Sequence, residues 1–169
     1  MKTLPYLILN IWLVLKVNEL SYTELLNDPN WYERFGDLPY GRTYAVSLTL
    51  KQRIGDLKLD EVYLEDTVSH FFYKMNTAVF GNAVKRFKKR LMMFGCWERT
   101  DRYHVHFAIE RPERLSHYEF TDLVRTNWRS TRWGYETDKI ETVYDFDGWV
   151  GYMNKRRTKP NGLIASLLI

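Results

Sequence analysis

The alternation of apolar and polar positions predicts the regular elements of this chain. Residues 43–50 (TYAVSLTL) alternate between the two kinds of side chain and are rich in β-branched and aromatic residues, which predicts a strand. From Leu64 to about Arg90, apolar residues recur at helical spacing. We expect Gly81 to kink or split this long helix.

The middle of the chain predicts a hairpin, then a helix and a further strand. Two strands are expected at 91–99 and 102–110, separated by a short polar turn. Ser116 is a good N-cap, with a glutamate three residues later, and predicts a helix that runs to about Trp128. Alternation returns at 139–144, which favours another strand.

A last helix is expected after that strand. Asp145 or Asp147 would cap it, and it would carry Trp149, Tyr152 and Lys155. The order strand, helix, strand, strand, helix, strand is typical of a ferredoxin-like split βαβ fold. The predicted class is therefore α+β: an antiparallel sheet with helices on one face and an added C-terminal helix that carries the tyrosine.

Three segments are expected along the 169 residues. Residues 1–42 form an apolar N-terminal extension and an irregular lead-in, 43–157 the main domain, and 158–169 a C-terminal tail whose role the sequence leaves open. Residues 4–17 are strongly apolar, but they fall short of the ~20 residues of a membrane-spanning helix. We expect this segment to pack on the domain or to reflect start-site choice, with membrane contact left open and no membrane partner expected.

Charge and cysteine content narrow the setting. The formal net charge is only +4, but the basic residues are clustered. One cluster comprises Lys85, Arg86, Lys88, Lys89 and Arg90, and the other Lys155, Arg156, Arg157 and Lys159. Clustered positive charge is typical of a polyanion-binding surface, although a solvated helix face is the commoner reason for such runs. The lone Cys96 excludes an internal disulfide, and we expect a reducing, cytoplasmic location in a bacterial host cell.

A histidine pair in the second predicted hairpin strand suggests a metal site. His104 and His106 are two residues apart, so both imidazoles point to one face of the strand, while Val105 faces the core. Glu98 lies across the hairpin, in register with one of the two histidines. Two histidines and a carboxylate suit Mg²⁺ or Mn²⁺ acting as a Lewis acid. The alternative is a polar strand face with an incidental ion pair.

The last helix suggests a nucleophile. Tyr152 and Lys155 are three residues apart and share a helix face, so phenol and ammonium can reach one phosphate. A phenol with its ordinary pKa of about 10 is a poor nucleophile at neutral pH, and a nearby cation and a metal-polarised phosphate lower that barrier. The alternative is a packed tyrosine with a surface lysine.

These motifs resemble those of the HUH endonucleases, in particular their single-tyrosine rolling-circle replication initiators from small phages and plasmids. YAVSLTL is similar to their first strand motif, YHVHF to the metal motif, with Glu98 as its acid, and YMNK to the tyrosine motif. The resemblance implies that Tyr152 attacks a phosphate of single-stranded DNA. The products would be a 5′-phosphotyrosine and a free 3′-OH that primes rolling-circle replication, and the reaction could reverse to join ends. Lys155 would position the phosphate.

The resemblance also implies partners and DNA contacts. The sequence has no Walker-type glycine-rich loop, so we expect a host helicase, and a host polymerase to extend the 3′-OH. The DNA, presented as an origin hairpin or nick site, would contact the two basic clusters together with Arg102 and Tyr103. Trp128, Trp133 and Trp149 are candidates for base stacking, although packing in the core is the commoner role.

Three alternatives stay open at this point. A transposase or relaxase of the same superfamily would share the cut, but the order of the motifs disfavours it, and Arg156, one turn after Tyr152, cannot ligate a metal. A phosphoesterase with paired histidine motifs would need a second pair. A non-catalytic module that binds single-stranded nucleic acid explains the basic clusters, but not the combination of histidines, acid and tyrosine.

Overall fold

The computed structural model describes residues 41–99, 101–153 and 163–165. Along the chain the elements are β1 (Thr43–Leu50), β2 (Arg53–Ile54), β3 (Leu57–Lys58), α3 (Glu61–Phe80), α4 (Ala83–Arg86), β4 (Met93–Arg99), β5 (Tyr103–Glu110), α5 (His117–Arg129), β6 (Gly134–Thr142), α6 (Phe146–Met153) and β7 (Leu163–Ala165). The predicted α+β class, with an antiparallel sheet and helices, is confirmed.

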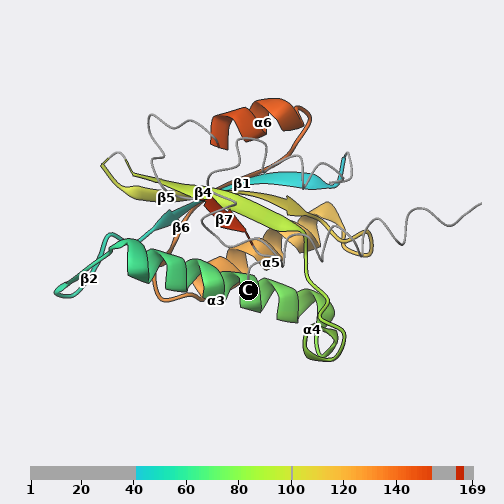
Figure 1. Cartoon of the computed structure of the whole chain (residues 1–169), viewed down its shortest axis with the longest axis horizontal. Helices are drawn as coiled ribbons and strands as arrows, with labels where there is room; N and C mark the ends of the chain where they lie inside the picture. The colour runs from blue at the N-terminus through green and yellow to red at the C-terminus, as the bar shows by residue number, and fades with distance from the viewer. Residues whose placement is uncertain (1–40, 100, 154–162, 166–169) are drawn as a thin grey trace, which may run out of the picture.

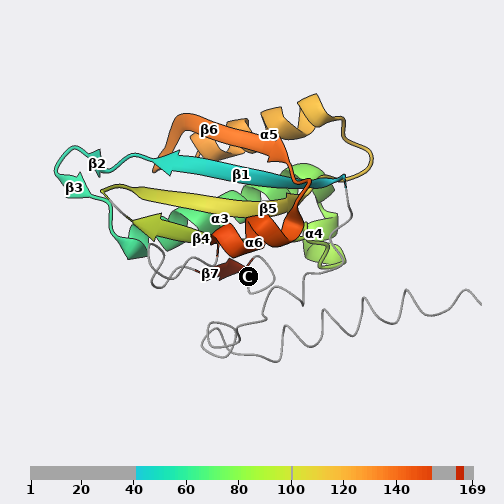
Figure 2. The ribbon, with the colours of Figure 1, turned by 90° about the horizontal axis from the view of Figure 1, so that it is seen from above.

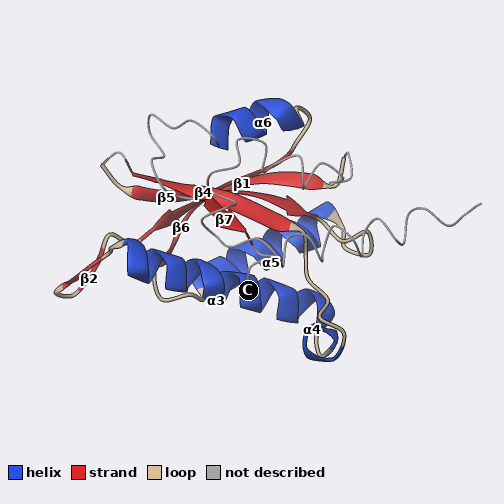
Figure 3. Cartoon of the chain, in the orientation of Figure 1, coloured by secondary structure: helices blue, strands red, loops and turns tan. Residues whose placement is uncertain are grey.

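The main sheet has the strand order β6-β1-β5-β4-β7, and its pairings are antiparallel. Helices α3 and α5 cover one face, and α6 lies on the other (Figure 1 and Figure 3). Seen from above, α6 lies over the sheet near β4 and β5 (Figure 2). Among the described elements, two helices thus cover one face of the sheet and the short helix α6 covers the other.

The core lies between the sheet and the helices α3 and α5. Alternate residues of β5, including Val105, Phe107 and Ile109, are fully buried there, as the period of a strand requires. Phe71 of α3 packs edge-on against Trp128 of α5, so the two helices share one aromatic cluster. Burial of these large side chains is the main stabilising term of the fold.

The helix ends follow local chemistry. Asp60 accepts a hydrogen bond from the backbone of Tyr63 and caps α3 four residues before the predicted start. Gly81 has φ +55°, a conformation that L side chains rarely adopt, and it separates α3 from α4 as expected. Ser116 and Glu119 form the predicted capping box at the start of α5.

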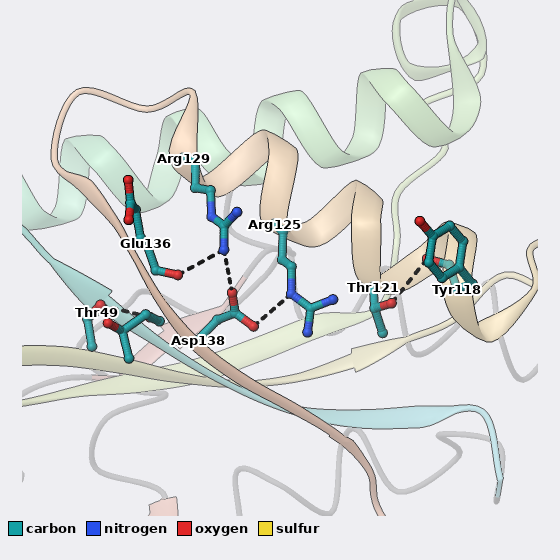
Figure 4. Close-up of polar contacts among 8 residues, drawn as sticks. Thr49, Tyr118, Thr121, Arg125, Arg129, Glu136 and Asp138 are labelled. Carbon is teal, nitrogen blue, oxygen red and sulfur yellow. Dashed lines mark hydrogen bonds and ion pairs between the residues drawn. The ribbon is translucent and has the colours of Figure 1, made fainter.

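Ion pairs fix α5 to the edge strand β6. The Asp138 carboxylate accepts from Arg125 Nε at 2.8 Å and from Arg129 Nη2 at 3.1 Å (Figure 4). Arg129 also donates to the backbone carbonyl of Glu136 at 2.9 Å. One carboxylate with two guanidinium partners thus anchors a helix to the strand that borders β1.

Strand β6 begins earlier than expected, and three short elements were not predicted. The β2–β3 hairpin and β7 are only two or three residues long, too short for an alternating pattern to be read. Among the described helices, none combines the length and the apolar character needed to cross a bilayer. The predictions for the apolar segment 4–17 lie outside the described residues.

Candidate active site beneath helix α6

Two rows of polar residues cross the sheet on the face that α6 covers. In the first row, Ser47 of β1 is paired with Lys139 of β6 and with His106 of β5, and His106 is paired with Cys96 of β4. Residues directly opposite each other on neighbouring strands share a face. Four chemically active side chains therefore lie side by side on this face of the sheet.

The second row lies two residues away on the same face. His104 of β5 is paired with Thr49 of β1 on one side and with Glu98 of β4 on the other. The predicted hairpin register placed Glu98 opposite one of the two histidines, and its backbone partner is His104. Both histidines and the acid therefore lie on one face, as their spacing predicted.

The imidazole of His106 has a polar partner at each nitrogen. Nδ1 lies 2.8 Å from Ser47 Oγ, and Nε2 lies 3.0 Å from Glu98 Oε1. The histidine side chain is 6% exposed and the glutamate side chain 17%. The tautomer of His106 that carries its proton on Nε2 satisfies both contacts, because it donates to the Glu98 carboxylate and accepts at Nδ1 from the Ser47 hydroxyl. This arrangement leaves Nε2 and the carboxylate facing each other.

Two of the three proposed metal ligands are in contact with each other, and the third is not part of that contact. Glu98 and His106 are in contact, whereas His104, which is half-buried, lines an adjoining pocket. Within the described part of the chain, no group of three histidine, cysteine or carboxylate side chains is gathered closely enough to hold a metal ion. A carboxylate oxygen beside an imidazole nitrogen is a suitable donor pair for Mg²⁺ or Mn²⁺.

Helix α6 places Tyr152 directly over His106. The two rings are 5.3 Å apart between centroids and nearly perpendicular, at 88°. Trp149, one turn earlier, is stacked on Tyr152 at 5.3 Å and also contacts the ring of His106 edge-on at 6.0 Å. Asp145 accepts from the backbone N–H of Gly148 at 2.9 Å and so caps the start of α6.

The pKa of the Tyr152 phenol is raised above its ordinary value. Partial burial is the largest cause, and the charge of Glu98 and then that of Cys96 add to it, while Lys139 acts in the opposite direction. Burial and negative neighbours both disfavour a phenolate. The ring is still 39% exposed, so solvent or a ligand can reach it.

Two residues at this site were not singled out in the sequence. Ser47 orients His106, and Lys139 is the cation whose charge favours the Tyr152 phenolate. The signal for Ser47 was available, because it is a polar position on the same strand face as Thr49 in TYAVSLTL. Lys139 could be found only from the register between β1 and β6.

The other candidate residues are scattered. Arg102 is exposed beside His104, whereas Tyr103 is 5% exposed and packs on Trp97, so its ring offers little surface to DNA. Trp128 and Trp133 are buried in the core, as expected.

The cluster Lys85, Arg86, Lys88 and Lys89 is exposed on α4 and just after it. Helix α4 lies on the opposite side of the sheet from α6 (Figure 1). The remaining basic candidates, Lys155, Arg156, Arg157 and Lys159, lie outside the described residues.

The comparisons with known proteins return no matching family model, curated protein or solved structure for this chain.

Proposed function

We propose that this protein is a metal-dependent endonuclease of the HUH type that nicks and joins single-stranded DNA through Tyr152. Its biological role would be to initiate rolling-circle replication of a phage or plasmid. One observation carries the proposal: the Tyr152 ring lies on the imidazole of His106, whose Nε2 is 3.0 Å from the Glu98 carboxylate. A phenol, an imidazole and an acid from three separate elements are thus within reach of one phosphate.

The strand order supports the ferredoxin-like assignment. The four strands that the sequence predicted lie across the sheet in the order β6-β1-β5-β4. Numbered by their place along the chain, this order is fourth, first, third, second. A helix follows the first strand and another follows the third, which is the split βαβ arrangement. Helix α6 would be the C-terminal addition that brings the tyrosine to the exposed sheet face.

Glu98 and His106 would hold the metal, with His104 as the third ligand after a side-chain rearrangement. When bound, the cation would supply Lewis-acid polarisation of the phosphate. Ser47 fits this role well, because it can accept a hydrogen bond from Nδ1 and thereby leave the Nε2 lone pair free for a metal. Metal-binding histidines commonly have their second nitrogen held in this way.

Tyr152 would be the nucleophile. The phenol gives up its proton to solvent as its oxygen attacks phosphorus, the bond from phosphorus to O3′ breaks, and the released O3′ takes up a proton to become a 3′-OH. The 5′ phosphate stays linked to Tyr152, so attack by a 3′-OH on this ester would rejoin strands without ATP. Trp149, stacked on Tyr152, would hold the phenol in place, Lys139 would favour its ionised form, and Lys155 would position the phosphate.

A covalent adduct is the test of this proposal. Wild-type protein, Tyr152→Phe and Tyr144→Phe would be incubated with a library of single-stranded oligonucleotides and Mn²⁺, and then separated under denaturing conditions. Tyr144 is a matched control because it is 84% exposed and lies just before α6. We expect adducts with the wild type and Tyr144→Phe, and none with Tyr152→Phe. Adducts that persist in Tyr152→Phe would assign the nucleophile elsewhere.

A second candidate is a non-catalytic module that binds single-stranded DNA. The raised pKa of Tyr152 favours it, because a phenol that resists ionisation is a weaker nucleophile. This candidate predicts salt-sensitive DNA binding by wild-type protein and no adduct with any oligonucleotide or divalent metal.

A further inference from the structure

A positively charged pocket adjoins the candidate active site. It has a volume of about 380 Å³ and lies where β1 ends and β5 and β6 begin. Its lining includes Thr49, Lys51, Arg53, Arg102, His104 and Tyr135. His104 and Thr49 belong to the second polar row of the sheet, so the pocket continues directly from the row that contains Glu98.

The charged side chains that line this pocket are basic. Three of its residues, Lys51, Arg53 and Arg102, are cationic, and its lining contains no carboxylate. Among the described residues, no acidic side chain forms an ion pair with any of the three. Cations without an acidic partner attract an anion, and a guanidinium group can bind a phosphate group through two parallel hydrogen bonds.

The walls of the pocket are fixed by hydrogen bonds between side chains and backbone. Gln52 accepts from the backbone N–H of Tyr103 at 3.0 Å and donates to the carbonyl of Leu50 at 2.8 Å. Thr49 donates to the carbonyl of Thr137 at 2.7 Å. The register between β1 and β6 shifts between Leu48 and Leu50, and such bulges often re-aim side chains beside functional sites. The pocket is therefore preformed, which lowers the entropic cost of binding.

An aromatic ring completes the pocket. Tyr135 is 48% exposed at the pocket wall, at the start of β6. An exposed ring beside cations is the combination with which proteins hold single-stranded nucleic acid: the cations contact the backbone and the ring stacks on a base. A phosphate and a base are parts of one nucleotide, and a volume of this size accommodates a small ligand.

We propose that this pocket binds a nucleotide of single-stranded DNA that neighbours the cleaved phosphate. Arg53 and Arg102 would contact its phosphate, and Tyr135 would stack on its base. This inference rests on the proposed nicking activity for the identity of the strand, but it assigns a separate site with its own residues. The pocket would set how far the DNA must extend beyond the cut and which base is preferred there.

The phosphate contacts can be tested without cleavage in a Tyr152→Phe background. Fluorescence anisotropy would measure how tightly each variant binds a labelled single-stranded oligonucleotide. Removal of one cation that neutralises a phosphate should lower the slope of log affinity against log salt by about 0.7. We expect a lower slope for Arg53→Ala/Arg102→Ala than for the control pair Lys74→Ala/Arg114→Ala, which removes the same charge from α3 and from the loop before α5, outside the pocket lining. Equal slopes for the two pairs would overturn the proposal.

The stacking contact is tested in the same assay. Tyr135→Ala should weaken binding by at least about fivefold, whereas Tyr135→Phe, which keeps the ring, should bind like the parent protein. Tyr118→Ala is the matched control, since Tyr118 is equally aromatic, 77% exposed and on α5, on the other side of the sheet. Unchanged binding of Tyr135→Ala would exclude stacking.

Failure of this inference can be told from failure of the proposed function. Adducts formed by wild-type protein, together with pocket variants that bind like their controls, would retain nicking and exclude the pocket. DNA binding that depends on Arg53, Arg102 and Tyr135, with no adduct under any condition, would retain the pocket and exclude nicking.

Discussion

His106 is held from both sides, by Ser47 at Nδ1 and by Glu98 at Nε2. A buried imidazole with a polar partner at each nitrogen has a fixed orientation. The spacing of the two histidines predicted that they share a strand face, with Glu98 beside them across the hairpin, whereas Ser47 was not singled out. The contact of Glu98 with His106 rather than with His104, its backbone partner, depends on side-chain conformations that no spacing rule specifies.

Ser47→Ala tests the orienting role of the hydroxyl. Loss of a partner that fixes a metal-binding histidine commonly costs about 10- to 100-fold in metal affinity. We therefore expect the Mn²⁺ concentration for half-maximal adduct formation to rise by about that factor, while Ser47→Thr, which keeps a hydroxyl, stays near wild type. An unchanged Mn²⁺ requirement in Ser47→Ala would show that Ser47 has only a structural role.

The raised pKa of Tyr152 makes stability depend on pH. A phenol whose folded-state pKa lies above its ordinary value of 10.0 contributes stability below that pH and loses it as pH rises through the folded-state pKa. Urea unfolding of wild type and Tyr152→Phe at pH 8 and above pH 10 measures this. We expect the wild type to lose stability relative to Tyr152→Phe at the higher pH. A difference that is constant with pH would mean that the phenol titrates normally.

At the scale of elements, the close approach of β4 to β5 depends on a glycine. A Cβ at Gly95 would lie 2.2 Å from the backbone oxygen of His106 and 2.3 Å from the Phe107 ring. The backbone cannot yield without moving the strand that carries both histidines. Gly95 therefore lets β4 bring Glu98 and Cys96 against β5.

Gly95→Ala should destabilise the protein by about 1–3 kcal/mol or more, as overpacking in a filled core does. Gly151→Ala is the matched control, because a Cβ at this exposed position of α6 would meet nothing within 4 Å. That change should be neutral or stabilising by up to about 1 kcal/mol, since alanine is the better helix former. Thermal unfolding of both variants measures the difference, and equal effects would contradict the packing argument.

The sequence predicted elements with clear periods or caps and missed those without. The split at Gly81, the capping box at Ser116 and the strand pair that carries the histidines all follow from local chemistry. The β2–β3 hairpin, by contrast, has two residues in each strand, and β7 is defined by its pairing with β4. Such pairings form through contacts between distant segments, which no local pattern encodes.

At the scale of the whole molecule, the sheet separates two kinds of surface. The candidate active site and the charged pocket are connected through His104, and α6 covers the polar sheet face. The basic cluster on α4 lies on the opposite side of the sheet (Figure 1). The sequence showed that charge was clustered, but not that the cluster on α4 lies across the sheet from α6, because that depends on the side of the sheet on which each helix packs.

Mapping the residue that carries DNA tests the central claim most directly. After incubation with Mn²⁺ and a cleavable oligonucleotide, trypsin would release residues 140–155 as one peptide containing both Tyr144 and Tyr152. Fragmentation of this peptide by mass spectrometry separates the two tyrosines. We predict that the nucleotide mass is found on Tyr152. A nucleotide on Tyr144 or on any other residue, or a cleaved oligonucleotide with no protein attached, would contradict the account.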